Sequence, residues 1–403
     1  MRKREPGPAA PWVLVSGDFR PLGGMDKANF VLAHHLIECN LPVFLVAHSV
    51  DPELRRRPGV EVCLVPKHGD SYLLAEGLLR KRAREVATDV CRRWPESRVL
   101  VNGGNCDWPD INWVHCVHSA WPCRDRGAPW WFRLKNRFAK RLARHSEEHA
   151  IRRARVILAN SERTRNDLVR LLHIEPGRIH TVYPGCDANL APPSAGERAA
   201  ARQWLGLSGE RPLIAFIGAL GHDHNKGFDT LWAVFRELCN LPAWDADLVV
   251  AGGGRNLPDW RFQIAASGLA SRVRVLGVTE RVPDVLAAAD LLVSPVRYEA
   301  FGLNVQEAIC RGVPAIVAAA AGVAELYPPE LGPMLLSNPE NCPALAAMLL
   351  VWRKKMPETR GAFAAFSERL RQYTWREMAE RIVAIAYADG AIVEVPVASG
   401  VFA

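Results

Sequence analysis

Several features that define other protein classes are missing from this chain of 403 residues. Its ten cysteines are scattered, without a Cys-x-x-Cys pair or a Cys/His cluster at zinc-binding spacing. This argues against the common zinc modules and indicates reduced thiols, as in cytosolic proteins. No window approaches 18 uninterrupted apolar residues, and the N-terminal segment MRKREPGPAAPW lacks an apolar run of signal-peptide length. We therefore expect no membrane span and a cytoplasmic protein.

The composition is that of an ordinary globular protein, with 49% hydrophobic and 23% charged residues and no internal repeat. The net charge of +8 admits nucleic acid, an anionic membrane surface or an anionic substrate as a partner. The length is enough for two domains that each bury a core.

The stretch from Ala287 to Tyr327 has the pattern of one βαβ unit. Leu291 to Pro295 predicts a strand, a helix starts near Gly302 or Leu303 and ends before Gly312, and Ala315 to Val317 predicts the next strand. Parallel sheets built from such units bind ligands at the carboxyl ends of their strands. The loop between the first strand and the helix is therefore a candidate site.

Side chains suited to a nucleotide sugar surround this loop. The helix start offers backbone N–H groups that suit a phosphate, at Phe301, Gly302, Leu303 and Asn304. Glu299 precedes it, and Glu307 lies on the helix three residues after Asn304, on the same face. An ionised carboxylate accepts two hydrogen bonds, which suits sugar hydroxyls. In the alternative interpretation, Glu299 caps the helix and Glu307 is a solvated helix residue.

Glu299 and Glu307, with Phe301-Gly302-Leu303 between them, resemble the Glu-x7-Glu motif of retaining GT-B glycosyltransferases of family 4, group 1 type. The resemblance implies two Rossmann-like domains facing each other across a cleft that holds a nucleotide-sugar donor. It places Glu299 against the donor sugar and Glu307 against the ribose. It also implies no cofactor and no metal, which agrees with the lack of an obvious acidic metal pair.

The amino half carries two weaker signals that match the same family. Gly23 and Gly24 lie between the strand from Trp12 to Ser16 and a helix, where a backbone can approach a diphosphate. The segment DINWVHCVHSAWPCRD predicts a strand in which His115 and His118 point to opposite faces. His118 sits at the strand end and matches the family histidine that faces the donor sugar. Either histidine could instead be a hydrogen-bonded packing residue.

The carboxyl half has a lysine where a diphosphate is expected. Lys226 stands just before a helix and can reach a phosphate as a point charge, or it is a solvated lysine. The family also has an Arg just after the strand glycine, here Gly218, but Ala219 and Leu220 follow it. His222, His224 or Asn225 is expected to replace that charge, or another domain supplies it.

We interpret the chain as a retaining, metal-independent glycosyltransferase of hexosyltransferase type. The predicted catalytic residues are His118, Glu299 and Lys226, and the predicted donor-binding residues are Gly23, Gly24, Gly218, Lys226, Phe301, Gly302, Leu303, Asn304 and Glu307. The expected domains are 1–190 on the acceptor side, 197–374 on the donor side, and 375–403 as a returning helix and tail. The acceptor is a glycan, a lipid-linked molecule or a small molecule, and no nucleic acid is expected. The alternatives are a GT-B epimerase or phosphorylase, or a catalytically weak nucleotide-sugar binding protein.

The basic segment from Trp130 to Arg155 admits two interpretations. Leu134, Phe138 and Leu142 are spaced by four and share a helix face, with Trp131 one turn before. Basic residues surround this stripe, as on helices that lie in a membrane interface, so the protein could dock on the inner face of an anionic membrane. In the alternative interpretation, the stripe faces the core and covers the sheet, and the charges are its solvated side.

Overall fold

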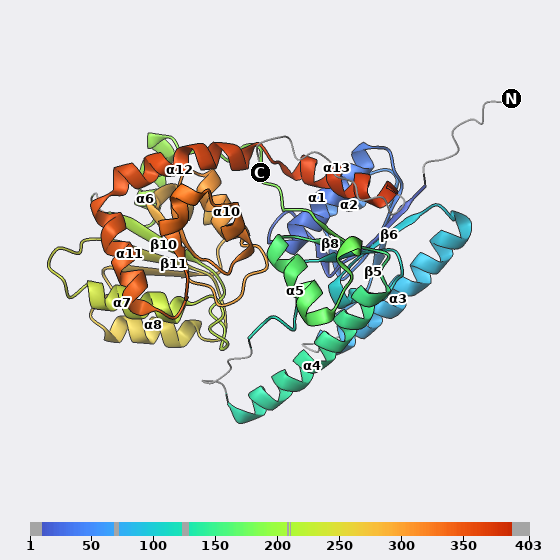
Figure 1. The fold of residues 1–403 in the computed structure, drawn as a ribbon, viewed down its shortest axis with the longest axis horizontal. Helices are drawn as coiled ribbons and strands as arrows, with labels where there is room; N and C mark the ends of the chain where they lie inside the picture. Colours follow the sequence, from blue (N-terminus) through green and yellow to red (C-terminus); the bar gives the residue numbers. More distant parts are fainter. Residues whose placement is uncertain (1–9, 68–71, 123–128, 208, 210, 389–403) are drawn as a thin grey trace. The chain divides into compact units, whose positions relative to one another are not determined.

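The computed structural model describes residues 10–67, 72–122, 129–207, 209 and 211–388. The predicted tail from 390 to 403 lies outside them. The chain folds into two compact units (Figure 1). Unit 1 comprises residues 1–120, 134–185 and 374–397, and unit 2 comprises residues 121–133, 186–373 and 398–403.

Unit 1 is built on a parallel sheet of seven strands in the order β5-β3-β1-β6-β7-β8-β9. Its strands are β1 (Trp12–Val15), β3 (Val43–Ala47), β5 (Val60–Leu64), β6 (Arg98–Asn102), β7 (Ile111–Val114), β8 (Val156–Ala159) and β9 (Ile179–Thr181); β2 (Asp18–Phe19) and β4 (Ser49–Val50) form a separate pair. Its helices are α1 (Met25–Glu38), α2 (Pro52–Arg56), α3 (Tyr72–Arg93), α4 (Trp130–Arg153), α5 (Glu162–Leu172) and α13 (Trp375–Tyr387).

Apolar strands and amphipathic helices explain this sheet. Every residue of β1, β7 and β8 is buried, as expected for parallel strands covered on both faces. One face packs on α3 through Leu79, Ala83, Ala87 and Val90. Where the sheet continues into β7 and β8, the same face packs on Ile151 of α4 and on Leu168 and Leu172 of α5. Ser161 is the N-cap of α5, since its hydroxyl accepts from the Thr164 amide at 2.9 Å.

Unit 2 has a parallel sheet of six strands in the order β12-β11-β10-β13-β14-β15. The strands are β10 (Leu213–Ile217), β11 (Asp247–Ala251), β12 (Val273–Gly277), β13 (Leu291–Ser294), β14 (Ala315–Ala318) and β15 (Leu335–Leu336). The helices are α6 (Ala195–Trp204), α7 (Phe228–Leu238), α8 (Leu257–Ala266), α9 (Val282–Ala288), α10 (Leu303–Cys310), α11 (Cys342–Lys354) and α12 (Met356–Arg371). Strands β10, β11 and β13 pack on α7, α8 and α11 in one core.

The predicted βαβ unit is present as β13, α10 and β14. Helix α10 ends as expected, because Gly312 has φ +74° and its amide donates to the Ile309 carbonyl at 2.8 Å. Strand β10 lies between β11 and β13, so the loops after these three strands meet at one edge of the sheet. That edge carries the candidate site residues of unit 2.

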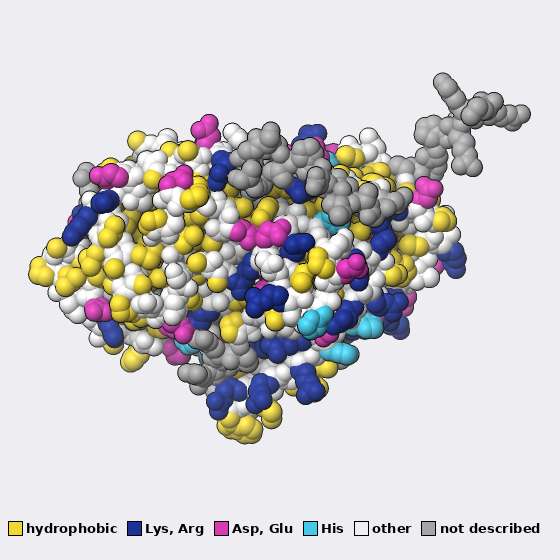
Figure 2. All heavy atoms as spheres, viewed as in Figure 1, with side chains coloured by type: hydrophobic (Ala, Val, Ile, Leu, Met, Phe, Trp, Pro, Cys, Tyr) yellow, Lys and Arg dark blue, Asp and Glu magenta, His cyan; other side chains and the backbone are white. Residues whose placement is uncertain are grey.

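Helix α4 does not cover the sheet with its predicted apolar stripe, and this corrects one of the two interpretations of the segment. Trp130, Trp131, Leu134, Phe138 and Leu142 are 71%, 54%, 64%, 61% and 39% exposed. Only the second half of the helix is buried, through Glu147, Ala150 and Ile151. Figure 2 shows apolar side chains at the lower tip, where α4 begins, with lysine and arginine side chains around them. In the described part of the chain, no helix combines the length and apolar character needed to cross a membrane.

Candidate active site

Glycines at the ends of β10 and β11 bring two loop backbones together in unit 2. Gly252, just after β11, has φ +143°, and a Cβ built on it would lie 1.9 Å from the carbonyl oxygen of Gly218. A Cβ on Gly254, with φ +152°, would lie 2.3 Å from the Leu220 oxygen. No side chain fits at either position, so the glycines allow this close packing of the strand ends.

Asn225 joins the loop after β10 to the loop after β13. Its side-chain amide donates to the Tyr298 carbonyl at 2.8 Å, and its side-chain oxygen accepts from the Tyr298 amide at 3.0 Å. The Arg297 amide donates to the Asn225 carbonyl at 2.8 Å. We call these three bonds the Asn225 clasp. Asn225 is 4% exposed, so its side chain is engaged in the clasp and is a poor candidate for the missing charge.

The clasp places Lys226 and Glu299 against each other. Lys226 directly follows Asn225, and Glu299 directly follows Tyr298, to which Asn225 is bonded. Their side chains form an ion pair between Lys226 Nζ and Glu299 Oε2, and they are 27% and 18% exposed. The aliphatic part of Lys226 lies beside Gly218, where an added Cβ would come within 3.2 Å of it. Three predicted site residues therefore meet at this edge of the sheet.

Helix α10 begins at the same edge. Gly302 precedes it with φ +115°, and an added Cβ would lie 3.0 Å from Val323 Cγ1 and 3.4 Å from Glu299 Cγ. The Asn304 side-chain amide donates to the Ile217 carbonyl at 2.8 Å, which fixes the first turn to the end of β10. Leu303 and Glu307 are half-buried, and Phe301 is buried. The first N–H groups of the helix, which have no intrahelical acceptor, lie beside the ion pair.

Arg297 is an arginine of this region that the sequence did not single out. Its guanidinium binds both carboxylate oxygens of Asp229, at 2.8 and 2.7 Å, and the Glu340 carboxylate at 3.0 Å. It also donates to the carbonyl of His224, which has φ +50°. These two carboxylates already balance its charge, so Arg297 is a structural brace rather than a substitute for the family arginine. Of the three expected replacements, His222 and His224 stay open.

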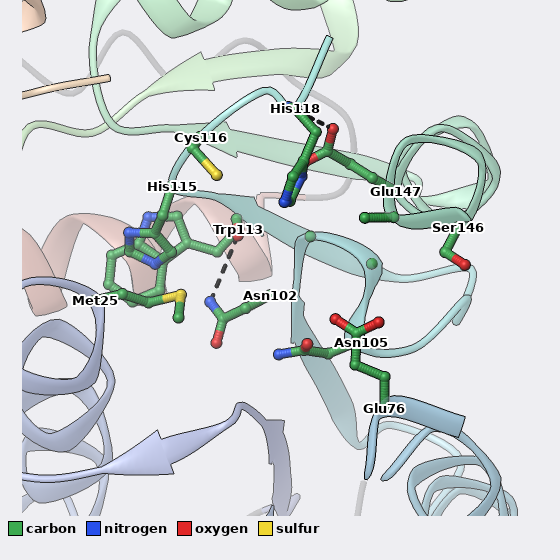
Figure 3. A pocket seen from close by; sticks show the side chains of 13 residues that line it. Met25, Glu76, Asn102, Asn105, Trp113, His115, Cys116, His118, Ser146 and Glu147 are labelled. Atoms are coloured by element: carbon green, nitrogen blue, oxygen red, sulfur yellow. Dashed lines mark hydrogen bonds and ion pairs between the residues drawn. The ribbon is translucent and has the colours of Figure 1, made fainter. Parts of the chain in front are cut away.

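In unit 1, the predicted residues lie after β1 and after β7. Gly23 has φ +88°, which favours glycine, and Gly24 is the N-cap of α1. His115 and His118 lie beyond β7, which ends at Val114. The prediction that they point to opposite faces of a strand is therefore wrong, because neither residue belongs to the strand. A cavity of about 160 Å³ opens here between α1, α3, α4 and the loops after β6 and β7 (Figure 3).

Glu147 of α4 holds His118 through two hydrogen bonds. The Glu147 carboxylate accepts from the His118 amide at 2.9 Å and lies 2.7 Å from its ring Nδ1 (Figure 3). The Glu147 side chain is only 2% exposed. The hydrogen bond to this carboxylate raises the pKa of His118, against the opposing effect of burial. With Nδ1 facing Glu147, Nε2 is left as the reactive nitrogen of the ring.

His115 has the opposite environment. The centroid of its ring lies 4.4 Å from that of the Trp113 ring, and its Nε2 is buried without a hydrogen-bond partner. Burial lowers the pKa of His115 to about 3, so this ring is neutral at ordinary pH. Of the two histidines, only His118 has the carboxylate partner that suits a charge-bearing role.

Among the described residues, one group carries metal-ligand types close together: one ligand atom from each of Cys116, His118 and Glu147 lies within 4.8 Å of the others. His118 and Glu147 are already bonded to each other, so a cation would have to open that pair. The absence of a resident metal stays a prediction.

Sequence reasoning missed Glu147 and the clasp. Glu147 lies 29 residues from His118 in a segment dense in charges, where one buried carboxylate cannot be told from solvated ones. A signal was present for Asn225, because it directly precedes the predicted lysine. Its tie to Tyr298, 73 residues away, depends on the strand order.

Two Rossmann-like parallel sheets, each with glycine turns near the carboxyl ends of its strands, define a GT-B protein. Solved structures share this fold. Sucrose-phosphate synthase from Thermosynechococcus elongatus aligns with a TM-score of 0.73 at 20% identity, over 93% of this chain and 98% of that chain. The Anabaena protein HepE in complex with UDP and glucose aligns with a TM-score of 0.68 at 19% identity, over 94% and 100%.

The chain belongs to the group 1, family 4 glycosyltransferases, which are retaining enzymes that use nucleotide-sugar donors. Residues 22–190 match the family described as Glycosyltransferase Family 4, and residues 211–352 match Glycosyl transferases group 1. D-inositol 3-phosphate glycosyltransferase of Mycolicibacterium gilvum (strain PYR-GCK) is 36% identical over 184 residues. That alignment covers 44% of this chain and 40% of the relative, so this chain matches less than half of the relative's length.

Proposed function

We propose that this chain transfers a hexosyl group from a nucleoside diphosphate sugar to an acceptor, with retention of anomeric configuration. The observation that carries the proposal is the group at the strand ends of unit 2. There the Asn225 clasp holds a lysine and a carboxylate beside the N-terminus of α10. A cation and the N-terminal amides of a helix suit a diphosphate, and the carboxylate suits sugar hydroxyls.

Each residue has a role that follows from its chemistry. Negative charge grows on the leaving diphosphate, and Lys226 with the amides at the start of α10 stabilises it. Gly218, Gly23 and Gly24 let backbone approach the donor. Glu299 and His118 hold the sugar, and Glu307 accepts hydrogen bonds from the ribose hydroxyls. Because Lys226 is paired with Glu299 here, an arriving diphosphate competes with that carboxylate for the ammonium group.

A donor panel tests the proposal. The chain is titrated calorimetrically with UDP, GDP and ADP, then incubated with their sugars while NMR follows the anomer that first appears. We expect one nucleotide to bind clearly better than the others and the released or transferred sugar to keep the donor's configuration. Lys226→Ala should weaken diphosphate binding, whereas Lys354→Ala, an exposed lysine of α11, should not. Tight donor binding without turnover would favour the catalytically weak binding protein. An isomerised donor would favour an epimerase.

We also propose that the exposed first half of α4 contacts an anionic membrane, which would bring the enzyme to a lipid-linked acceptor. The support is the exposure of its apolar stripe together with the surrounding basic residues: Arg133, Lys135, Arg137, Lys140, Arg141 and Arg144. This pattern is typical of helices that lie in the membrane interface.

A further inference from the structure

The loop after β11 places Arg255 beside the loop after β10. The backbone amide of Asn256 donates to the Leu220 carbonyl at 3.0 Å. Gly254 packs so closely on the same residue that an added Cβ would lie 2.3 Å from the Leu220 oxygen. Arg255 lies between these two fixed residues, so its backbone is held at the edge of the sheet that carries Lys226.

The guanidinium of Arg255 lies over an aromatic ring. Its Cζ is 5.1 Å from the ring centroid of Phe132, which unit 2 includes although it lies in the first turn of α4. The His222 ring packs on the same phenyl ring, with 5.3 Å between the centroids and an interplanar angle of 69°. Because His222 belongs to the loop after β10, Phe132 holds the guanidinium close to that loop. A cation–π contact positions the guanidinium without placing a negative charge beside it, so its N–H donors can still bind an anion.

The charges at this edge of the sheet favour such a role. Lys226 is paired with Glu299, and Arg297 is held by two carboxylates. Residues 219–225, which lead from β10 to Lys226, include no lysine or arginine. The Arg255 guanidinium, by contrast, is exposed and has no carboxylate partner in the described part of the chain. A diphosphate carries more negative charge than one lysine that is already paired with a glutamate can balance, so a second permanent cation is needed.

The reach of the arginine is sufficient. Gly252 packs on Gly218, and the aliphatic part of Lys226 lies beside the same Gly218. Arg255 is three residues after Gly252, so their Cα atoms are at most about 10 Å apart. A diphosphate that contacts Lys226 is therefore within range of a long side chain on the next loop.

We propose that Arg255 binds the diphosphate of the donor together with Lys226, and that Phe132 positions its guanidinium. The inference rests on the proposed transfer reaction for the identity of the ligand, but it concerns binding and needs no turnover. Lys226 supplies a point charge, whereas the planar guanidinium binds two phosphate oxygens at once.

The test compares nucleotides that differ by one phosphate. UDP, GDP, ADP and the corresponding monophosphates are titrated calorimetrically into the full chain at one ionic strength, and the nucleoside with the tightest diphosphate is used. Arg255→Ala should weaken diphosphate binding about tenfold or more, the usual effect of losing a hydrogen bond to a charged group. Monophosphate binding should fall by a clearly smaller factor, because Lys226 and the first amides of α10 match its smaller charge.

Three further variants separate charge, position and general effects. Arg255→Lys keeps the charge but not the forked geometry, so it should recover only part of the affinity. Phe132→Leu keeps the arginine and removes the ring beneath it, so it should weaken diphosphate binding severalfold. Arg236→Ala is the matched control, because Arg236 is also exposed but lies in the last turn of α7, at the opposite end of that helix from Lys226. It should bind like the parent chain.

Equal diphosphate affinity of Arg255→Ala and the parent chain would overturn the inference. An equal loss for diphosphate and monophosphate, or a similar loss in Arg236→Ala, would overturn it as well. These results leave the proposed function intact, because a transferase can bind its donor through Lys226 and α10 alone. A parent chain that binds a diphosphate through Arg255 but transfers no sugar would instead refute the proposed function and keep this inference, and a parent chain that binds no diphosphate would refute both.

Discussion

At the scale of single residues, the environment of His118 differs from that of an ordinary surface histidine. Glu147 accepts from both the backbone amide and the ring of His118, and it is itself buried. The same carboxylate thus fixes the position of the loop after β7, the orientation of the ring and the ease of its protonation.

Glu147→Gln should lower the pKa of His118, because a neutral amide no longer stabilises the charged imidazolium. The native pKa is raised, so protonated His118 adds stability fully below the unfolded value near 6.5, and this is lost as pH rises through the native pKa. The variant should lose this extra stability at low pH, and any dependence of turnover on His118 should move to lower pH.

An NMR titration of the His118 ring measures this pKa in the free protein. Glu148→Gln is the matched control, since Glu148 is the neighbouring residue and pairs with Arg152 instead. An unchanged pKa in Glu147→Gln would mean that the carboxylate does not control the histidine.

Glu307 offers a second test at this scale, because its proposed partner is the ribose. Glu307→Ala should weaken binding of the nucleoside diphosphate itself by roughly 1.5–3 kcal/mol, the usual worth of a hydrogen bond to a charged group. Calorimetry with the diphosphate that binds best gives the value, and Glu330→Ala, at an exposed site of the same unit, is the control. Equal affinity of a folded variant would make Glu307 a solvated helix residue.

At the scale of elements, two glycines of unit 2, Gly252 and Gly268, both have positive φ but differ in how much space an added Cβ would have. Gly252→Ala would drive a Cβ to 1.9 Å from the Gly218 oxygen, so the ends of β10 and β11 must separate. Gly268→Ala is a matched change at φ +75° with nothing within 4 Å, so its cost is only the backbone strain of about 1–2 kcal/mol.

Urea unfolding should therefore show a larger loss of stability for Gly252→Ala than for Gly268→Ala. Diphosphate binding should fall only for Gly252→Ala, because the turn after β10 is beside Lys226. Similar losses in both variants would show that the close packing of these two turns is not essential.

Helix α4 gives the second prediction at this scale. The chain should sediment with vesicles rich in anionic lipid at low salt, since each lysine or arginine near such a surface adds about 1 kcal/mol. Binding should fade as salt rises, because charges are screened over about 8 Å at physiological ionic strength.

Replacing Trp131 and Phe138 by serine should reduce vesicle binding severalfold without loss of folding, because both side chains are exposed. The matched change is Val351→Ser, an exposed apolar residue of α11. Equal and negligible binding to anionic and neutral vesicles at low salt would contradict the membrane contact.

Elements could be predicted well where the residue pattern is local. The βαβ unit from Leu291 to Ala318 and the cap at Ser161 follow from apolar runs, glycine positions and side-chain caps. The exposure of α4 could not be predicted, because an apolar stripe looks the same whether protein or lipid covers it. Its residues 134, 138 and 142 have the helical spacing of a core face, yet their side chains are exposed.

At the scale of the whole molecule, the strand order decides which loops meet, and local patterns do not contain it. The predicted Lys226 and Glu299 are 73 residues apart and meet only because β10 lies next to β13. The resemblance to a known family supplied that arrangement. The Asn225 clasp and the pairing of Glu147 with His118 could be found only in the structure, because nothing in the sequence spacing of these residues marks them.

The two points where the chain enters and leaves unit 2 have a consequence for the gene. Within unit 2, the Cys186 amide donates to the Tyr373 carbonyl at 3.0 Å, so the first and last residues of its main segment are bonded. Just outside, a Cβ on Gly185 would lie 2.3 Å from Thr374, which explains the glycine of the YPGCD segment.

A segment whose ends meet can be excised or transplanted without stretching either end. We expect residues 186–373, expressed alone, to fold cooperatively and bind the preferred diphosphate within about tenfold of the full chain. Such a portable donor module would let recombination pair one nucleotide-sugar specificity with new acceptor halves, and failure of the excised segment to fold would argue against that modularity.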